Sequence, residues 1–481
     1  MSFIEWSRRI GHRNSALCLA WMLLIFYVEL AAAQPNQSQS SGAQPDAISV
    51  SDVVQRALQE YPQIHVSQEE LNASIANIRQ ARTAYLPRAD AMFQANRATR
   101  NNVFGALLPQ SIIPPISGPV IGSNNAGSVW GSAAGVLVTW EPFDFGLRHA
   151  NVDAARAAKT KANAALLNSQ LEVGTAAADA FLTYVAAKET VRAAGAAVDN
   201  WNTLLKTIQA LATAQLRPGA DESRIEAELA MTRTQLVYAR QAEQESKITL
   251  EKFLVSASPD LELNSERLLT SLPPDGEESV FNSAAHPLME QQKAVVAQST
   301  AQLHALERTW VPRFTLEGAA SARGTGAETN GLRLQDWNGL APNIQNYAAG
   351  FNVTFSFFDF ASIHAKESAQ SATVRAEQAR EQLIDRTLNE SFGKAKAALI
   401  AAREVANNTP VELKSAQTTF EQAKARYQAG LAPIDDLAQA QRLLVQAEVD
   451  DSIARLSVWR ALLQYDAARG DLNPFLQAVN K

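Results

Sequence analysis

Two histidines stand at equivalent positions in a chain that repeats itself. His149 follows Phe143 by six residues, and His364 follows Phe358 by six. In a trimer these side chains would place six imidazoles at one level, where a ring of metal ligands is imaginable. No carboxylate or cysteine accompanies either histidine at the spacing that a zinc site requires. We therefore expect surface or interfacial histidines and no metal site.

No other group of side chains predicts catalysis. His65, His286 and His304 are isolated, and the Gly-Thr-Gly of residues 324–326 lies in a predicted strand connection. A phosphate-binding loop would instead follow a buried strand. The single cysteine, Cys18, lies in an N-terminal segment that we expect to be removed, which leaves no thiol nucleophile. The sequence therefore predicts a protein that is not an enzyme and uses no cofactor.

Residues 1–33 have the pattern of a signal peptide. Three arginines precede an apolar run at residues 16–30, and the Ala-Ala-Ala of residues 31–33 is a small-residue cleavage site. An uncleaved membrane anchor is the alternative, but the run is shorter than the ~20 apolar residues of a membrane-spanning helix and contains Glu29. Residues 34–47 are rich in Gln, Ser and Pro and are expected to be a disordered leader.

The mature chain is acidic. The whole sequence has 43 Lys and Arg against 49 Asp and Glu, and the first 33 residues contain three of the former and two of the latter, which leaves a net charge of −7. A nucleic-acid-binding protein normally carries a basic stripe. We therefore expect no nucleic-acid partner.

The mature chain is also duplicated, which is the decisive observation about its organisation. We expect a first structural repeat at residues 48–256, an equatorial linker at 257–279, a second repeat at 280–475 and a tail at 476–481. Four pairs of short motifs recur in the same order: Tyr61-Pro62 and His286-Pro287, Tyr85-Leu86-Pro87-Arg88 and Trp310-Val311-Pro312-Arg313, Phe143-Asp144-Phe145-Gly146 and Phe358-Asp359-Phe360-Ala361, Arg217-Pro218-Gly219 and Ala429-Gly430-Leu431.

Each repeat reads as helix, strand, loop, strand, very long helix, sharp turn and helix, with the first helix running from Ile48 to about Tyr85. Residues 147–214 and 362–428 are Ala-rich with apolar residues three and four apart. At ~1.5 Å per residue each would be a helix on the order of 100 Å long. A single hydrophobic core cannot use that length, whereas the wall of a coiled coil can.

The predicted strands alternate between apolar and polar residues. Residues 313–323 and 347–357 do so most clearly, and each is about as long as a tilted membrane-crossing strand. A soluble sheet with one face on a core alternates in the same way, but the signal peptide and the long helices favour a membrane. Four strands cannot close a barrel, and an open edge is not tolerated in lipid. Two copies would supply eight strands and three would supply twelve.

The most specific motif is the Arg-Tyr-Gln-Ala-Gly-Leu of residues 426–431, followed by the Asp-Asp-Leu-Ala-Gln-Ala-Gln of residues 435–441. Together with the Phe-Asp-Phe-Gly of residues 143–146, it resembles the TolC-like outer-membrane factors, also called outer membrane efflux proteins. The resemblance covers nearly the whole mature chain. It implies a mainly α fold with membrane β: a TolC-like α/β barrel with four strands per protomer in a shared 12-stranded β-barrel, plus a long α-helical coiled-coil barrel.

The resemblance also implies a function. The chain would be the outer-membrane channel of a tripartite efflux pump or type I secretion system in a Gram-negative-type bacterium, with a periplasmic helical domain. It would act as a homotrimer that gives passive exit to substrates, in contact with outer-membrane lipid, a periplasmic adaptor (membrane fusion) protein and an inner-membrane transporter.

At the tip of the helical hairpins the resemblance assigns roles to single residues. Tyr427 matches a tyrosine that helps to hold the tip closed, and Asp436, next to Asp435, falls at an acidic gate position. Charge compensation at a helix N-terminus explains these two acids equally well. Gln439 replaces the second gate acid, and Ala432 stands where the family often has a basic residue. The adaptor contact would comprise Arg217, Pro218, Gly219, Ala429, Gly430 and Leu431.

Two other classes of protein share part of this pattern. A periplasmic coiled-coil adaptor or scaffold without a pore would have the signal peptide and the helices, but it would lack the duplicated strands. An exported enzyme would have a polar catalytic cluster in a compact domain.

Overall fold

The computed structural model describes residues 47–99, 127–213, 219–254, 262–274, 280–326, 328, 334, 336–355 and 357–480. The predicted signal peptide and all of the predicted leader except Ala47 lie outside these residues. The chain from Ile48 onward groups into one unit, and everything below concerns that unit.

The predicted order of helices and strands occurs twice, and the mainly helical fold with four antiparallel strands is confirmed. The first set is α2 (Val50–Glu60), α3 (Pro62–Thr83), β1 (Arg88–Thr99), β2 (Ser128–Phe143), α4 (Leu147–Thr213) and α5 (Gly219–Glu251), with α6 (Glu266–Thr270) after it. The second set is η1 (Ser283–Ala285), α7 (Pro287–Leu306), β3 (Arg313–Thr325), β4 (Ile344–Thr354), η2 (Phe357–Asp359), α8 (Phe360–Gln428), α9 (Ile434–Arg469) and α10 (Asn473–Asn480).

Two elements differ by more than two residues from the predictions. The last strand was expected at residues 347–357 and is Ile344–Thr354. The first helix was expected to run without a break to Tyr85, but it divides into α2 and α3 at Tyr61, whose backbone is extended (ψ 128°). Pro62 is the cause, because its ring excludes the helical conformation at the preceding residue. Pro62 and Pro287 each occupy the first turn of a helix, where a missing N–H costs nothing. The repeated X-Pro motif is therefore a repeated helix start.

The Phe-Asp-Phe-Gly motif makes the joint between β2 and α4. The Asp144 carboxylate accepts hydrogen bonds from the backbone N–H of Gly146 (3.3 Å) and of Arg148 (2.5 Å), which caps the first turn of α4. The buried Arg148 guanidinium donates to Asp144 Oδ2 (2.9 Å) and to the carbonyl of Ala84 (3.1 Å) and lies over the Tyr85 ring. In the second repeat Asp359 makes no such side-chain cap, so the two joints are not equivalent.

The four strands form one antiparallel sheet in the order β1-β2-β3-β4. The register aligns Ala91 with Val136, Val136 with Ala320, and Ala320 with Tyr347. Directly paired residues point to the same side of a sheet, so one side, the apolar face, is mostly nonpolar across all four strands, with Arg97 and Gln345 among its polar residues. Its large side chains are exposed: Phe93, Val136, Val138, Trp140, Phe143, Leu316, Tyr347, Phe351 and Val353. The alternation predicted for residues 313–323 and 347–357 thus extends through β1 and β2.

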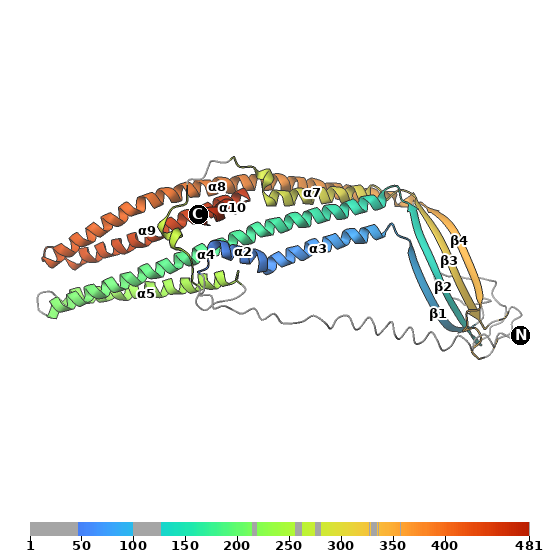
Figure 1. Ribbon diagram of the computed structural model, residues 1–481, viewed down its shortest axis with the longest axis horizontal. Coiled ribbons are helices and arrows are strands. Elements are labelled where there is room, and N and C mark those ends of the chain that lie inside the picture. The colour runs from blue at the N-terminus through green and yellow to red at the C-terminus, as the bar shows by residue number, and fades with distance from the viewer. Residues whose placement is uncertain are drawn as a thin grey trace, which may run out of the picture. The chain divides into compact units, whose positions relative to one another are not determined.

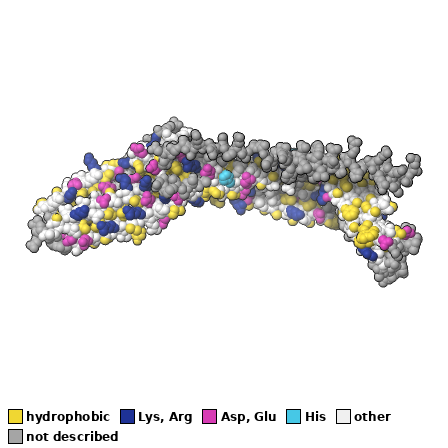
Figure 2. Space-filling view, turned by 60° about the horizontal axis from the view of Figure 1, so that its bottom comes forward, with side chains coloured by type: hydrophobic (Ala, Val, Ile, Leu, Met, Phe, Trp, Pro, Cys, Tyr) yellow, Lys and Arg dark blue, Asp and Glu magenta, His cyan; other side chains and the backbone are white. Residues whose placement is uncertain are grey.

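The helices pack against one another and extend away from one end of the sheet. Figure 1 shows α4 and α8 leading away from the strands, with α3 and α7 beside them and α5 and α9 beside their more distant parts. Hydrophobic side chains gather at the end that carries the strands, while charged side chains are scattered over the helices (Figure 2). Among the described residues, no helix is both long enough and apolar enough to cross a bilayer.

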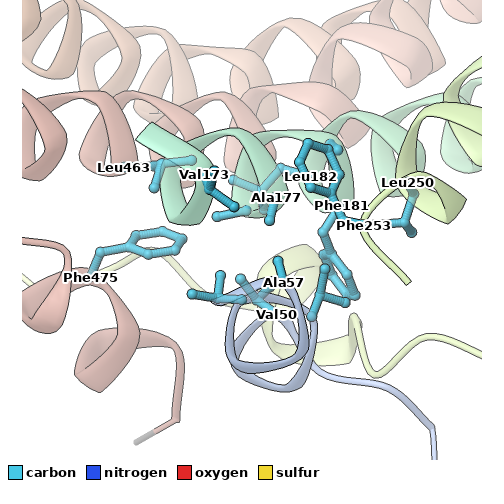
Figure 3. Packing of buried hydrophobic residues seen from close by; sticks show 14 of the residues in the cluster. Val50, Ala57, Val173, Ala177, Phe181, Leu182, Leu250, Phe253, Leu463 and Phe475 are labelled. Atoms are coloured by element: carbon cyan, nitrogen blue, oxygen red, sulfur yellow. The ribbon is translucent and has the colours of Figure 1, made fainter. Parts of the chain in front are cut away.

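The largest core joins the two repeats. It contains residues of α2, α4 and α5 from the first repeat and of α9 and α10 from the second. In Figure 3, Phe475 of α10 lies beside Val50 and Ala57 of α2, opposite Val173 and Ala177 of α4. All five side chains are buried. The first and last helices of the unit, α2 and α10, therefore pack into the same core.

A buried carboxyl in α9 makes stability depend on pH. Asp466 is 2% exposed, and burial, helped by the Asp471 carboxylate and opposed by Arg469, raises the pKa of Asp466 to about 6. The fold therefore favours the protonated form of Asp466. The contribution of Asp466 to the free energy of unfolding is full below pH ~4 and is lost as the pH rises through 6. The loss reaches about 3 kcal/mol, at ~1.4 kcal/mol per pKa unit. Thermal melts should show Asp466→Asn more stable than wild type at pH 7.5 but not at pH 4.5. Equal melting temperatures of wild type and Asp466→Asn at both pH values would contradict this.

Candidate functional site at the helical hairpin tips

The turn between α8 and α9 is built by a glycine. Gly430 has φ +77°, its N–H donates to the carbonyl of Tyr427 (3.0 Å), and the N–H of Leu431 donates to the carbonyl of Arg426 (2.9 Å). These two bonds are the Schellman arrangement that ends a helix with a left-handed residue. Pro433 then precedes the first residue of α9. The sequence predicted this sharp turn, and its geometry explains why a glycine occupies residue 430.

An apolar cluster joins this hairpin to the hairpin of the first repeat. The tip cluster takes buried side chains from all four helices: Trp201 and Ile208 of α4, Ile225 and Leu229 of α5, Tyr427 of α8, and Ile434, Leu437 and Ala438 of α9. Neither hairpin alone would bury these side chains, so the cluster favours the two tips lying together. Full burial of one such side chain stabilises a contact by about 1.5–3 kcal/mol.

A hydrogen bond lies at the edge of the tip cluster. The Tyr427 ring is 2% exposed, and its hydroxyl donates to Asp221 Oδ2 at 3.0 Å. Asp221 is in the first turn of α5, 206 residues earlier in the chain. The sequence alone does not indicate which residue of the first repeat meets Tyr427, and the structure shows that it is Asp221.

Three ion pairs extend this contact along α5 and α9. Arg224 Nε lies 3.4 Å from Asp435 Oδ1, and Arg224 Nη2 lies 3.6 Å from Glu228 Oε1. Arg442 Nη1 lies 3.4 Å from the same Glu228 oxygen. The Glu228 side chain is only 6% exposed, so its carboxylate depends on these guanidinium groups for compensation. The bond from Tyr427 and these three pairs are together called the hairpin link.

Two of the residues predicted to form a gate belong to the hairpin link, and two do not. Tyr427 and Asp435 belong to the hairpin link. Asp436 and Gln439 instead line a cleft of about 290 Å³ between α8 and α9, together with Arg426. An isolated role in helix capping does not account for Asp435, since it also has a cationic partner in α5.

The residues predicted to contact an adaptor lie at the turns. Leu431 is 72% exposed next to Gly430 and Ala429, and Gly219 is the first residue of α5. Arg217 and Pro218 lie outside the described residues.

The histidines have acidic neighbours that the sequence analysis did not recognise. His149 Nε2 lies 3.1 Å from Asp153 Oδ2, and His364 Nδ1 lies 3.8 Å from Glu367 Oε2. The statement that no carboxylate accompanies them at ligand spacing was therefore wrong, because residues three or four apart share one helix face. Within the part of the chain that the structure describes, no group of three or more potential ligands forms. That the protein binds no metal stays a prediction.

Four residues of the hairpin link were missed by sequence reasoning: Asp221, Arg224, Glu228 and Arg442. The spacing of Arg224 and Glu228 is visible in the sequence as a helical i,i+4 pair. Their partners in α9 are more than 200 residues away along the chain, and nothing local indicates them.

Comparisons with solved structures show the same fold. CmeC of Campylobacter jejuni, an outer membrane channel, is 14% identical with a TM-score of 0.70, over 88% of this chain and 85% of CmeC. VceC of Vibrio cholerae is 16% identical with a TM-score of 0.66, over 88% and 96%. The open state of the Neisseria gonorrhoeae MtrE outer membrane channel is 16% identical with a TM-score of 0.67, over 88% and 89%.

Two further comparisons concern the sequence. A search of the curated proteins finds no match. The family model described as outer membrane efflux protein matches residues 53–254 and 283–471, which takes in both sets of helices and strands and the hairpin tips. The resemblance inferred from residues 143–146 and 426–441 is thereby confirmed, and the chain belongs to the outer membrane efflux protein family.

Proposed function

We propose that three copies of this chain form a passive exit duct through the outer membrane, as the channel component of a tripartite efflux pump or type I secretion system. The observation that carries the proposal is the family match over both repeats. The apolar face of the sheet and the long helices that lead away from it support it. The chain supplies the conduit, and the energy for transport comes from an inner-membrane partner.

The edges of the sheet support a barrel shared between copies. Its two edge strands, β1 and β4, have 12 and 11 residues, and among the described residues of one chain each has a neighbour on one side only. Backbone groups left unpaired in lipid cost several kcal/mol each, so the edges must pair. Pairing β4 of one copy with β1 of the next keeps the antiparallel alternation. Three copies then make a barrel of about 12 strands, wider than the smallest membrane barrels of about eight.

The hairpin tips are the entrance in this proposal. The hairpin link holds the two hairpins of one copy together, and the duct opens when they separate. The gonococcal MtrE structure is an open state, and we infer that this chain also has an open and a closed state. The exposed turn around Leu431, with Ala429, Gly430 and Gly219, is the contact for a periplasmic adaptor, and Arg217 and Pro218 belong to the same proposed contact.

Asp436 and Gln439 remain candidates for the lining of the entrance. Both are exposed in the first turns of α9 and line the cleft between α8 and α9. Three-fold symmetry would bring three Asp436 carboxylates to one level, where they would favour cations.

The pore-less adaptor or scaffold has no observation in its favour, because the chain carries the complete four-stranded sheet.

Recording from planar bilayers tests the duct. Purified protein should behave as a trimer in detergent and give cation-preferring channels, and Asp436→Asn should lower the preference for potassium over chloride by roughly twofold or more. Asp153→Asn, which removes an exposed acid of α4, serves as the matched control and should leave selectivity unchanged. Recovery as a soluble periplasmic monomer, or a folded trimer without conductance, would refute the duct. Unchanged selectivity in Asp436→Asn would remove only Asp436 from the entrance.

A further inference from the structure

The apolar face of the sheet is not uniformly bulky. A trough of about 950 Å³ crosses it, lined by the small side chains of Ala91, Ala134, Ala320 and Ala322 and bordered by Phe93 and Tyr347. These alanines come from β1, β2 and β3 and are brought into two adjacent rows by the register. We call this hollow the alanine trough.

Large side chains surround the alanine trough. Phe93 is 69% exposed and Tyr347 is 92% exposed, so both project from the sheet as walls on either side of the alanines. A flexible hydrocarbon chain fits such a hollow, because it can bend to follow the alanines and make close van der Waals contact with them. Of the polar residues along the trough, Ser321 and Asn346 point to the opposite face of the sheet, because each is one residue away from Ala320 or Tyr347. Gln345 is then the polar side chain that the trough offers to a ligand.

A cationic site lies on the same face, nearer to the end of β1. Arg97 pairs with Trp130 in the register, and its guanidinium lies 5.5 Å from the centre of the Trp130 ring. Trp130 in turn stacks on Trp337 at 6.0 Å with an angle of 14°. Arg97 Nε donates to Ser128 Oγ at 2.9 Å. Among the described residues, its two terminal nitrogens have no hydrogen-bond acceptor, so up to four N–H groups are available to an anion.

The spacing of the two features matches a lipid. Arg97 is four residues beyond Phe93 on β1, which corresponds to about 13 Å at ~3.3 Å per residue. One leaflet contributes about half of the ~30 Å hydrocarbon core. Tryptophans such as Trp130 and Trp337 are typical of the level where hydrocarbon meets headgroups. A lipid whose acyl chain lies in the trough would therefore place its phosphate next to Arg97.

We propose that the apolar face holds one phosphate-bearing lipid, with an acyl chain in the alanine trough and its phosphate on Arg97 over the Trp130–Trp337 stack. This inference rests on the proposed function, which places the sheet in a membrane and joins the copies through the edges of their sheets. A neighbouring copy is not the occupant, because copies join through the strand edges and leave this face free. Arg97 is the specificity-determining residue, since its replacement by an uncharged side chain would leave the trough unchanged but remove the contact that binds the phosphate.

Native mass spectrometry of the purified trimer tests the site with two probes, dipalmitoyl phosphatidylglycerol and dipalmitoyl glycerol, which share acyl chains and differ in the phosphate headgroup. Wild type should retain phosphatidylglycerol at least tenfold better. Arg97→Gln should lose that preference, because a charge-assisted hydrogen bond is worth about tenfold or more in affinity. Arg97→Lys should keep part of it. Ala134→Leu, which fills the trough, should weaken both probes.

Arg88→Gln is the matched control. Arg88 is on the same strand but on the opposite face and at the other end, where it pairs with Asp90, and its loss should change nothing. Equal retention of the two probes by wild type would overturn the inference, as would equal retention of phosphatidylglycerol by the Arg97→Gln and Arg88→Gln proteins. A trimer that conducts but does not discriminate between the probes refutes the lipid site alone. A protein that neither inserts nor conducts refutes the proposed function.

Discussion

Channels of the double variant Tyr427→Phe, Arg224→Ala are expected to open far more often than wild-type channels. Tyr427→Phe keeps the buried ring and removes only the hydroxyl bond to Asp221. Arg224→Ala removes the pair with Asp435 and leaves Glu228 to Arg442 alone. A hydrogen bond to a charged group contributes about 1.5–3 kcal/mol, and a pair with an exposed acid contributes at most about 1 kcal/mol. The closed state should lose about 2–3 kcal/mol in all, a shift of roughly 30- to 150-fold.

Open probability in planar bilayers measures this effect. Each single variant should give part of it, and a double-mutant cycle shows whether the two contacts are coupled. Tyr238→Phe is the matched control, because Tyr238 is a tyrosine of α5 that is 66% exposed and outside the hairpin link. If the double variant conducts as rarely as Tyr238→Phe, the hairpin link does not hold the entrance closed. Melting temperatures near that of wild type would show that the change lies in gating and not in folding.

Trp459→Ala should cause the largest loss of stability. Trp459 of α9 is fully buried in the core that joins the repeats, and its Nε1–H donates to the carbonyl of Ser271 at 2.9 Å. Replacement by alanine leaves a cavity and an unpaired carbonyl. Large-to-small changes of this kind cost about 3–5 kcal/mol. The loss should appear as a lower thermal midpoint of the helical circular dichroism signal of the detergent-solubilised protein.

Two further variants separate the effect of the lost side-chain volume from that of the lost hydrogen bond. Trp459→Phe keeps most of the ring volume, so it should cost roughly half as much as Trp459→Ala, with the lost hydrogen bond contributing about 1 kcal/mol. Trp310→Ala is a surface control, because Trp310 is 55% exposed. A midpoint for Trp459→Ala equal to that for Trp310→Ala would mean that this core does not limit the stability of the unit.

The predictions that succeeded rest on short-range signals. The period of two in residues 313–323 and 347–357 identifies strands, and three- and four-residue spacings identify α4 and α8, because side-chain direction follows from backbone geometry alone. The glycine at residue 430 predicted the turn between α8 and α9 for the same reason. Where a local signal was overlooked, as with Pro62, the helix boundary was wrong.

The site depended on information of another kind. Periodicity shows that Tyr427 and Asp435 belong to particular faces of α8 and α9, but not which residues of α5 lie opposite. The rotation of each hairpin about its axis is set by packing in the tip cluster, through buried side chains such as Trp201 and Leu437. That rotation brings Asp435 to Arg224 and places Asp436 along the cleft between α8 and α9.

By itself the sequence determined the duplication, the helices and strands, the apolar alternation and the family, since each is encoded within a few turns or strand residues. Only the tertiary structure shows that Tyr427 pairs with Asp221 and that Glu228 lies between Arg224 and Arg442. It also shows that Arg97 and the alanine trough share one face of the sheet. Those arrangements join residues of different helices or strands, and they follow from packing and register.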